Sequence, residues 1–222
     1  MPFDNDVRMK ALLWADRHCC LCKKPCGANI EVHHLVPESD GGGSDIDNAI
    51  PLCFDCHGHV HHYSERHPVG TKYKTEELRR RREQVYEEFT RPLVPPIHYE
   101  VTQSMPNGGL RPFPDVGFVV QHLGATLPVR LKVVAEMRLN GESLGSSSGA
   151  HYSGAGLWNL NPQSLISGHF TFDSRSRSGK LGIIVTLTVV DQYDREHPNL
   201  PVAWVYMPDV SSWYFEPCIA EV

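Results

Sequence analysis

The spacing of apolar residues changes at about residue 92. Before that point, it predicts helices over residues 3–18, 55–63 and 76–91, with apolar positions three to four residues apart in the first and last. After that point, apolar and polar residues alternate over 129–139, and a β-branched run covers 182–190. Both patterns are typical of strands. The sequence therefore predicts a mixed first part and a β-rich second part.

The proline-rich segment Arg91–Pro96 separates the two patterns and predicts a domain joint. We expect an α+β chain in which domain 1–92 is followed by an all-β domain, 97–222, built as a sandwich or a partly open barrel. Long loops are expected over 38–47 and 142–156, where glycine and polar residues gather. The shorter strand candidates are 30–32, 116–121, 168–172 and 202–207.

Composition narrows the class of protein. Hydrophobic residues make up 41% of the chain, enough for a folded core. The sequence has no run of 18 apolar residues and its first six residues lack the features of a signal peptide, so we expect a cytoplasmic protein without a membrane span. The net charge of −5 is unlike that of proteins that coat nucleic acid, so any such contact requires a local basic patch.

One segment has the charge of such a patch. Residues 65–82 hold seven Lys and Arg against three Glu. The candidate contacts to nucleic-acid phosphates are Lys72, Lys74, Arg79 and Arg82. The alternative is an ordinary solvated helix face whose arginines pair with nearby glutamates.

Cysteines are concentrated in the first domain. Six of the seven lie between residues 19 and 56, which favours a metal site over disulfides in a chain without an export signal. Two C-x2-C pairs supply Cys19, Cys22, Cys53 and Cys56. Four thiolates suit a closed, tetrahedral structural zinc site, which would stabilise a small domain. Cys20 and Cys26 are expected to be spare, although Cys26 can substitute through a C-x3-C spacing; the alternative is a set of buried free thiols.

Histidines lie between and after these pairs in a recognisable order. The sequence reads EVHHL at 31–35, GGG at 41–43, DNAIPLC at 47–53 and CHGHVHH at 56–62. This arrangement resembles the HNH endonuclease family, and the resemblance covers about the first 90 residues. It implies a ββα-metal fold and hydrolysis of phosphodiester bonds in DNA.

The resemblance also implies a role for each motif residue. His33 matches a ligand of a catalytic divalent cation, and His34 matches the general base that activates water. Asn48 matches the residue that shapes the loop between the two strands, while His57 and His61 match further metal ligands. The residue types agree with these roles, because neighbours on a strand point to opposite faces and residues four apart on a helix share one.

The residues at this position suit more than one catalytic cation. Many family members carry an acid at the position of His33, whereas imidazole is a softer ligand that also suits Zn²⁺, Ni²⁺ or Mn²⁺ besides Mg²⁺. The other histidines of this region, His59, His62 and His67, are expected to face solvent or phosphate.

The second domain matches no family that we recognise. We expect it to recognise a DNA target, to bind a small-molecule or protein trigger with residues 151–161 as a pocket loop, or to form a homodimer. The alternative is a plain β domain in which this segment is an ordinary loop. An HNH domain fused to such a domain resembles bacterial restriction and anti-phage effectors. Two alternatives for the whole chain remain: a non-catalytic zinc module that binds nucleic acid or protein, and an RNase or toxin nuclease.

Overall fold

The chain divides into two compact units. A computed structural model describes residues 3–62, 73–103, 113–147, 157–170, 172, 179–199 and 201–217. Unit 1 comprises Met1–Leu93 together with Tyr193–Arg195, and unit 2 comprises Val94–Gln192 and Glu196–Val222. Among the described residues, no helix is both long enough and apolar enough to cross a membrane.

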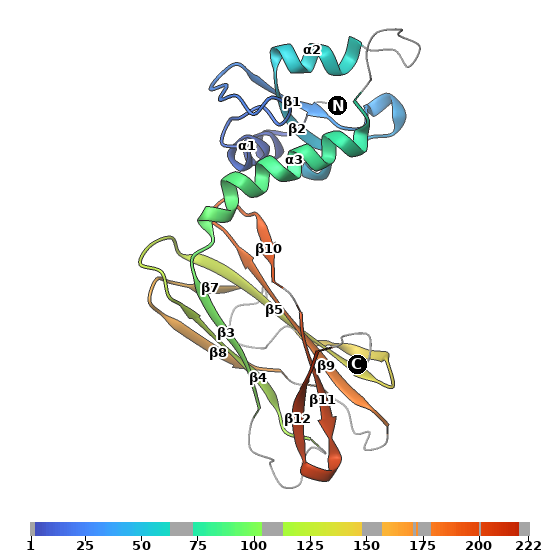
Figure 1. Ribbon diagram of the computed structural model, residues 1–222, viewed down its shortest axis with the longest axis vertical. Helices are drawn as coiled ribbons and strands as arrows, with labels where there is room; N and C mark the ends of the chain where they lie inside the picture. The colour runs from blue at the N-terminus through green and yellow to red at the C-terminus, as the bar shows by residue number, and fades with distance from the viewer. Residues whose placement is uncertain are drawn as a thin grey trace. The chain divides into compact units, whose positions relative to one another are not determined.

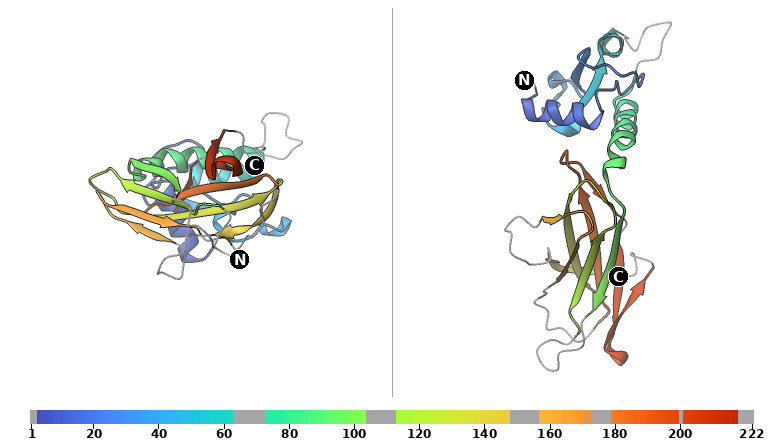
Figure 2. Two further views of the ribbon diagram at one scale, coloured as in Figure 1. Left: turned by 90° about the horizontal axis from the view of Figure 1, so that it is seen from below. Right: turned by 90° about the vertical axis from the view of Figure 1, so that its left-hand side faces the viewer.

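Unit 1 is a two-stranded antiparallel sheet with helices on both sides (Figure 1). In the register of its two strands, His33 is opposite Ile50 and His34 is opposite Ala49. Helix α2 lies on one side of the sheet, and α1 and α3 lie on the other (Figures 1 and 2). The elements are α1 (Asn5–Trp14), β1 (Ile30–His34), β2 (Ala49–Cys53), α2 (Phe54–His62) and α3 (Thr75–Thr90), with short 3-10 turns η1 (Glu38–Asp40), η2 (Ile46–Asn48) and η3 (Arg91–Leu93).

The ends of α1 follow from local chemistry. Its N-cap is Asp4, whose carboxylate accepts a hydrogen bond of 2.8 Å from the Val7 amide. The sequence predicted a helix as far as residue 18, but the structure ends it at Trp14. Asp16 and Arg17 take φ angles of 44° and 51°, a left-handed conformation that a right-handed helix cannot contain.

The core of unit 1 lies between the sheet and helices α1 and α3. Leu78 and Val85 of α3 are buried, as are Ile50 and Leu52 of β2 and Ala15, the C-cap residue of α1. All five residues of β2 are buried, so its sequence is apolar rather than alternating. The predicted apolar face of the last helix is therefore confirmed at residues 78 and 85.

Unit 2 is an all-β sandwich, as the sequence predicted. One sheet has seven strands, five of which have the order β12-β11-β9-β5-β6. The other two are β10, which pairs with β9, and β7, which pairs with β5. A second sheet has the order β3-β4-β8. Phe118 and Val120 of β4 share one buried cluster with Val133 of β5 and Leu187 of β9, so the two sheets face each other (Figure 2). The strands are β3 (Ile97–Gln103), β4 (Val116–His122), β5 (Val129–Leu139), β6 (Glu142–Ser147), β7 (Trp158–Leu160), β8 (Leu165–His169), β9 (Leu181–Val190), β10 (Glu196–Pro198), β11 (Val202–Met207) and β12 (Ser212–Glu216).

One loop prediction in unit 2 was wrong. Residues 142–147 form strand β6, which pairs with β5 after a turn at Asn140 and Gly141. Five of the six β6 residues are exposed, so the strand lacks the buried apolar positions that would identify it in the sequence. Residues 148–156, which complete the predicted loop, lie outside the described part of the chain.

Candidate functional site

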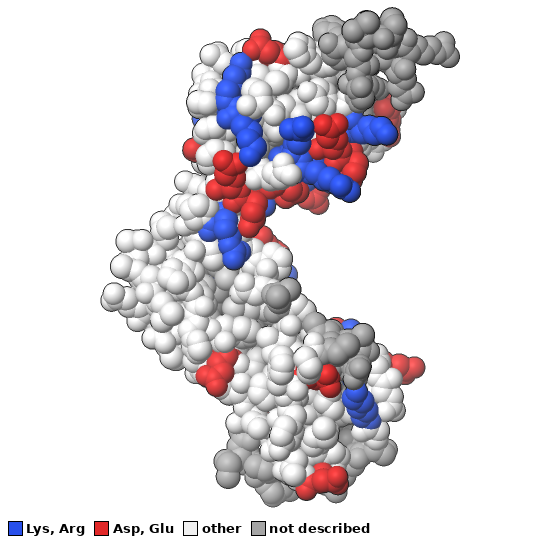
Figure 3. Space-filling model, in the orientation of Figure 1, with Lys and Arg blue, Asp and Glu red and all other residues white. Residues whose placement is uncertain are grey.

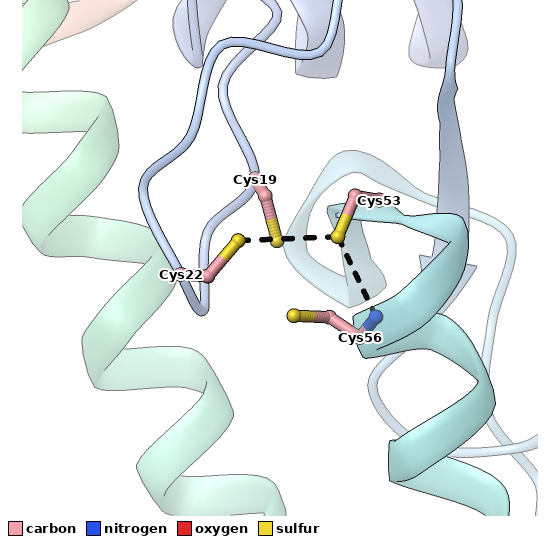
Figure 4. Close-up of side chains that lie close together, drawn as sticks. All are labelled: Cys19, Cys22, Cys53 and Cys56. Atoms are coloured by element: carbon pink, nitrogen blue, oxygen red, sulfur yellow. Dashed lines mark hydrogen bonds between the residues drawn. The ribbon is translucent and has the colours of Figure 1, made fainter.

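Four cysteines converge in unit 1. The sulfur atoms of Cys19, Cys22, Cys53 and Cys56 all lie within 4.8 Å of one another (Figure 4). The Sγ atoms of Cys22 and Cys53 are 3.9 Å apart. Bonds of about 2.3 Å in a tetrahedron place two sulfurs roughly 3.8 Å apart, so the cluster fits one zinc-sized cation. The cluster thus fits a structural metal site of the kind that the two C-x2-C pairs predicted.

Tight turns bring each pair together. The first turn is closed by hydrogen bonds from the Lys23 amide to the Cys19 carbonyl (2.8 Å) and from the Cys19 amide to the Lys24 carbonyl (3.0 Å). Lys23 takes a φ angle of 57° at the turn. In the second pair, Cys53 ends β2, and its sulfur accepts a hydrogen bond of 3.5 Å from the Cys56 amide at the start of α2. The metal site therefore fixes the direction in which α2 begins.

The protonation of these thiols links metal binding to pH. Burial acts to raise the pKa of Cys53, but hydrogen bonds led by that from the Cys56 backbone lower it to about 7. Burial raises the pKa values of Cys22 and Cys56 above their usual range. A cation must therefore displace protons from the thiols, and its affinity falls as the pH falls.

The two spare cysteines lie outside the cluster. Cys20 is buried, and burial raises the pKa of its thiol. Its amide donates a hydrogen bond of 3.0 Å to the Pro51 carbonyl, which ties the first turn to β2. The thiol of Cys26 donates to the Lys24 carbonyl over 3.2 Å.

His33 and His57 meet on the face of the sheet that carries α2. Their ring centroids are 4.9 Å apart, at an interplanar angle of 75°. Glu31, two residues before His33 on the same face of β1, places Oε2 3.5 Å from His57 Nδ1. Sequence reasoning missed Glu31, although its spacing from His33 could have identified it. The side chain of the third predicted ligand, His61 of α2, lies outside the described part of the structure.

His34 lies apart from this pair and contacts a different set of side chains. Its ring stacks on Phe3, with centroids 3.9 Å apart and planes at 15°. Its Nε2 atom is 3.3 Å from Ser44 Oγ and 3.7 Å from Glu38 Oε1. Burial lowers the pKa of His34 below the usual histidine value, which favours the neutral ring that can accept a proton.

Asn48 joins the two ends of the loop between β1 and β2. Its side chain accepts a hydrogen bond from the Val36 amide (2.8 Å) and donates to the carbonyls of Val36 (3.0 Å) and Gly43 (2.7 Å). The residue is only 8% exposed, so these bonds satisfy a side chain that burial would otherwise penalise. The loop that carries Ser44 is thus folded around Asn48.

Replacing Gly42 by alanine is expected to distort this loop. A Cβ at residue 42 would overlap the Val36 carbonyl and lie 2.8 Å from Asn48 Nδ2. We expect a loss of about 1–3 kcal/mol in unfolding free energy, measurable by urea denaturation. The control is Gly58→Ala on α2, where a Cβ meets nothing within 4 Å and the expected effect is neutral or stabilising. Equal stability of the two variants would contradict this account of the loop.

The predicted basic patch is largely a set of paired side chains on α3. Arg79 and Arg80 both bond to Glu76 over 3.0 Å, and Arg81 bonds to Glu77 over 3.3 Å. Blue and red side chains are correspondingly interleaved on the surface in Figure 3. Lys74 is exposed. Lys72 lies outside the described residues.

Arg82 is placed differently from what the sequence suggested. It is 5% exposed, and its Nη1 donates to the carbonyls of Ile46 (3.3 Å), Asp47 (2.6 Å) and Ala49 (3.3 Å). A guanidinium with these partners cannot reach a phosphate without leaving them. We therefore correct its predicted role from nucleic-acid contact to support of the turn that carries Asn48.

Comparisons with known proteins agree with this site. A family model described as HNH endonuclease matches residues 19–63. Anaredoxin of Nostoc sp. (strain PCC 7120) is 30% identical over 60 residues, or 27% of this chain and 79% of that protein. The type IV methyl-directed restriction enzyme EcoKMcrA of Escherichia coli (strain K12) is 46% identical over 33 residues, or 15% of this chain and 12% of the enzyme, so only a small part of that enzyme is matched. Through residues 19–63, with their cysteine cluster and histidine pair, the chain belongs to the HNH endonuclease family.

Proposed function

We propose that the chain is a metal-dependent endonuclease that hydrolyses phosphodiester bonds in DNA. The observation that carries the proposal is that the two neighbouring histidines of β1 have different surroundings. His33 lies beside His57 at a ring separation of 4.9 Å, whereas His34 stacks on Phe3 and contacts Ser44. The proposed cation ligand and the proposed base are thus neighbouring residues of one strand that have different surroundings.

The residues suggest the following chemistry. His33 and His57, joined by His61, would hold a divalent cation, either Mg²⁺, Mn²⁺, Ni²⁺ or Zn²⁺. When bound, that cation supplies positive charge to the phosphate oxygens. Neutral His34 takes a proton from water, and the water oxygen forms a new bond to phosphorus. The bond from phosphorus to the leaving sugar oxygen breaks, and that oxygen takes a proton from solvent.

Glu31 adds a supporting role. Its carboxylate faces His57 Nδ1 at 3.5 Å, so it favours the tautomer that presents Nε2 to a cation. For binding of the DNA backbone we propose Lys72, Lys74 and Arg79. Each would contact phosphate without reading sequence. Arg82 is left out because its guanidinium donates hydrogen bonds to main-chain carbonyls.

A plasmid-nicking assay tests the proposal. The wild-type protein should convert supercoiled DNA to the open-circular form with at least one of the four cations and not in EDTA. His34→Ala should lower the rate by about 10²–10⁴-fold, because it removes the general base. His59→Ala is the matched control, since His59 is an exposed histidine of α2 and its loss should leave the rate unchanged.

Each result decides between the candidate functions. Equal cleavage by wild type and His34→Ala would contradict the mechanism in which His34 is the general base. Cleavage of RNA but not DNA would support the RNase or toxin alternative. Binding of either nucleic acid without cleavage under any condition would favour the non-catalytic module.

The biological role that we propose is bacterial restriction or anti-phage defence in the cytoplasm, with unit 2 as the controlling domain. Its support is the fused β domain and the local similarity to a methyl-directed restriction enzyme. Unit 2 can read the target, bind a small-molecule or protein trigger, or join two copies of the chain. Nicking rates on methylated and unmethylated plasmid separate the first role from the others, because equal rates would remove target reading, and sedimentation tests for a homodimer.

A further inference from the structure

We propose that Ser44 and Glu38 are positioning residues that fix the tautomer of His34. This inference rests on the proposed function, because it concerns the residue assigned as the general base. Neither residue belongs to the motif positions that the family resemblance identifies, and both lie in the loop between β1 and β2. Hydrogen bonds join the three side chains, and the direction of these bonds determines the tautomer.

The hydrogen atoms in this group can be assigned from chemistry. The Ser44 hydroxyl donates to Glu38 Oε1 over 3.5 Å, and an ionised carboxylate can only accept. A hydroxyl has one hydrogen, so a Ser44 hydroxyl that donates to Glu38 offers only its lone pairs to His34 Nε2, 3.3 Å away. Nε2 therefore carries the ring hydrogen of neutral His34, and Nδ1 carries the lone pair that takes a proton from water. The negative charge of Glu38, 3.7 Å from Nε2, favours the same arrangement.

The loop is built so that Ser44 cannot easily move away. The residue before it, Gly43, accepts a hydrogen bond of 2.7 Å from the Asn48 side chain. The residue after it, Asp45, accepts a bond of 3.1 Å from the Asn48 amide. Asn48 thus holds both neighbours of Ser44, and this gives the central Asn of the motif a specific task in this chain.

The plane of the His34 ring is fixed by a separate contact. Phe3 is only 6% exposed and packs with Ala11 and Ala49, so its own ring is held in place. The nearly parallel stack at 3.9 Å limits rotation of the imidazole out of its plane. Stacking on one face and a directed hydrogen bond at one edge together define the position of Nδ1. Contacts of this length in a free enzyme are expected to shorten when substrate binds.

Steady-state nicking kinetics of loop variants test the inference. Ser44→Ala should lower kcat by roughly 10–100-fold with little change in KM, because it removes an orienting partner and no substrate contact. Ser44→Thr, which keeps the hydroxyl, should restore kcat to within a few-fold of wild type. Ser39→Ala is the matched control, because Ser39 is an exposed serine of the same loop whose hydroxyl bonds only its neighbour Asp40 among the bonds described. Glu38→Gln should lower kcat more than its control Asp40→Asn.

A second measurement reports on the tautomer without requiring activity. Nitrogen NMR of ¹⁵N-histidine-labelled full-length protein should show His34 as the Nε2–H tautomer in the wild type. Ser44→Ala should increase the Nδ1–H population, while Ser39→Ala should not. A wild-type His34 that carries its hydrogen on Nδ1 would overturn the inference.

The outcomes separate this inference from the proposed function. If wild type cleaves DNA and His34→Ala does not, yet Ser44→Ala behaves as Ser39→Ala does, the positioning role is wrong and the nuclease assignment stands. If wild type cleaves nothing, the nuclease assignment fails, and the NMR tautomer alone decides whether Ser44 and Glu38 orient the ring.

Discussion

Replacement of Cys53 by serine is expected to abolish the folded state of unit 1 and release its metal. The Cys53 sulfur contacts members of both C-x2-C pairs, because it accepts from the Cys56 amide and lies 3.9 Å from Cys22 Sγ. The site joins the turn after α1 to the junction of β2 and α2. Structural zinc contributes apparent binding energies of about 10–16 kcal/mol in small zinc domains, which is as large as the whole stability of a typical domain, about 5–15 kcal/mol.

The expected result can be measured in two ways. Elemental analysis of the wild type should give at least one zinc per chain, and Cys53→Ser should hold one zinc fewer. Circular dichroism of Cys53→Ser should lose helical signal while the β signal of unit 2 remains. The control is Cys26→Ser, because this buried thiol lies outside the cluster and a serine hydroxyl can still donate to the Lys24 carbonyl. If the analysis found iron in place of zinc, the predicted identity of the structural metal would be wrong. A Cys53→Ser protein that kept its metal and its helices would refute the structural role of the cluster.

The sequence predicted the cluster of four cysteines because a metal site of this kind depends on local spacing. A C-x2-C pair closes a turn by itself, so Cys19 with Cys22 and Cys53 with Cys56 can be found without knowing the fold. The separation of His33 and His34 was also predictable, since a strand turns neighbours to opposite faces. What lies on each face depends on segments far along the chain. Nothing in the local pattern indicates that Phe3 stacks on His34.

The same reasoning explains the errors. Strand β6 was missed because its residues are exposed, and an edge strand can be held by main-chain bonds alone. The end of α1 was placed four residues too late because polar Asp16 and Arg17 have no feature that excludes a helix. Four consecutive arginines look like a basic surface in the sequence. Only the helix phase and the partners across the fold distinguish buried Arg82 from exposed Arg79, Arg80 and Arg81.

Replacement of Arg82 by methionine is expected to destabilise unit 1 by about 2–4 kcal/mol, because three main-chain carbonyls lose a charged donor in a buried place. Methionine keeps much of the apolar stem, so the change isolates the guanidinium. The affected carbonyls belong to Ile46, Asp47 and Ala49, on both sides of Asn48. Tyr86 donates to the Ala49 carbonyl over 3.4 Å and provides only part of the lost support. The nicking rate should fall with stability, since the turn holds Asn48 and, through it, the loop beside His34.

A neighbouring arginine gives the matched control. Arg81 is exposed on the same helix and bonds only to Glu77 among the ion pairs described, at 3.3 Å. Because solvent screens such a pair, Arg81→Met should change stability by less than about 0.5 kcal/mol. Urea denaturation and nicking kinetics of both variants test the corrected role of Arg82. If Arg82→Met kept wild-type stability but raised KM for DNA, its guanidinium would be a phosphate contact after all, and the turn would be held by Asn48 and Tyr86 without it.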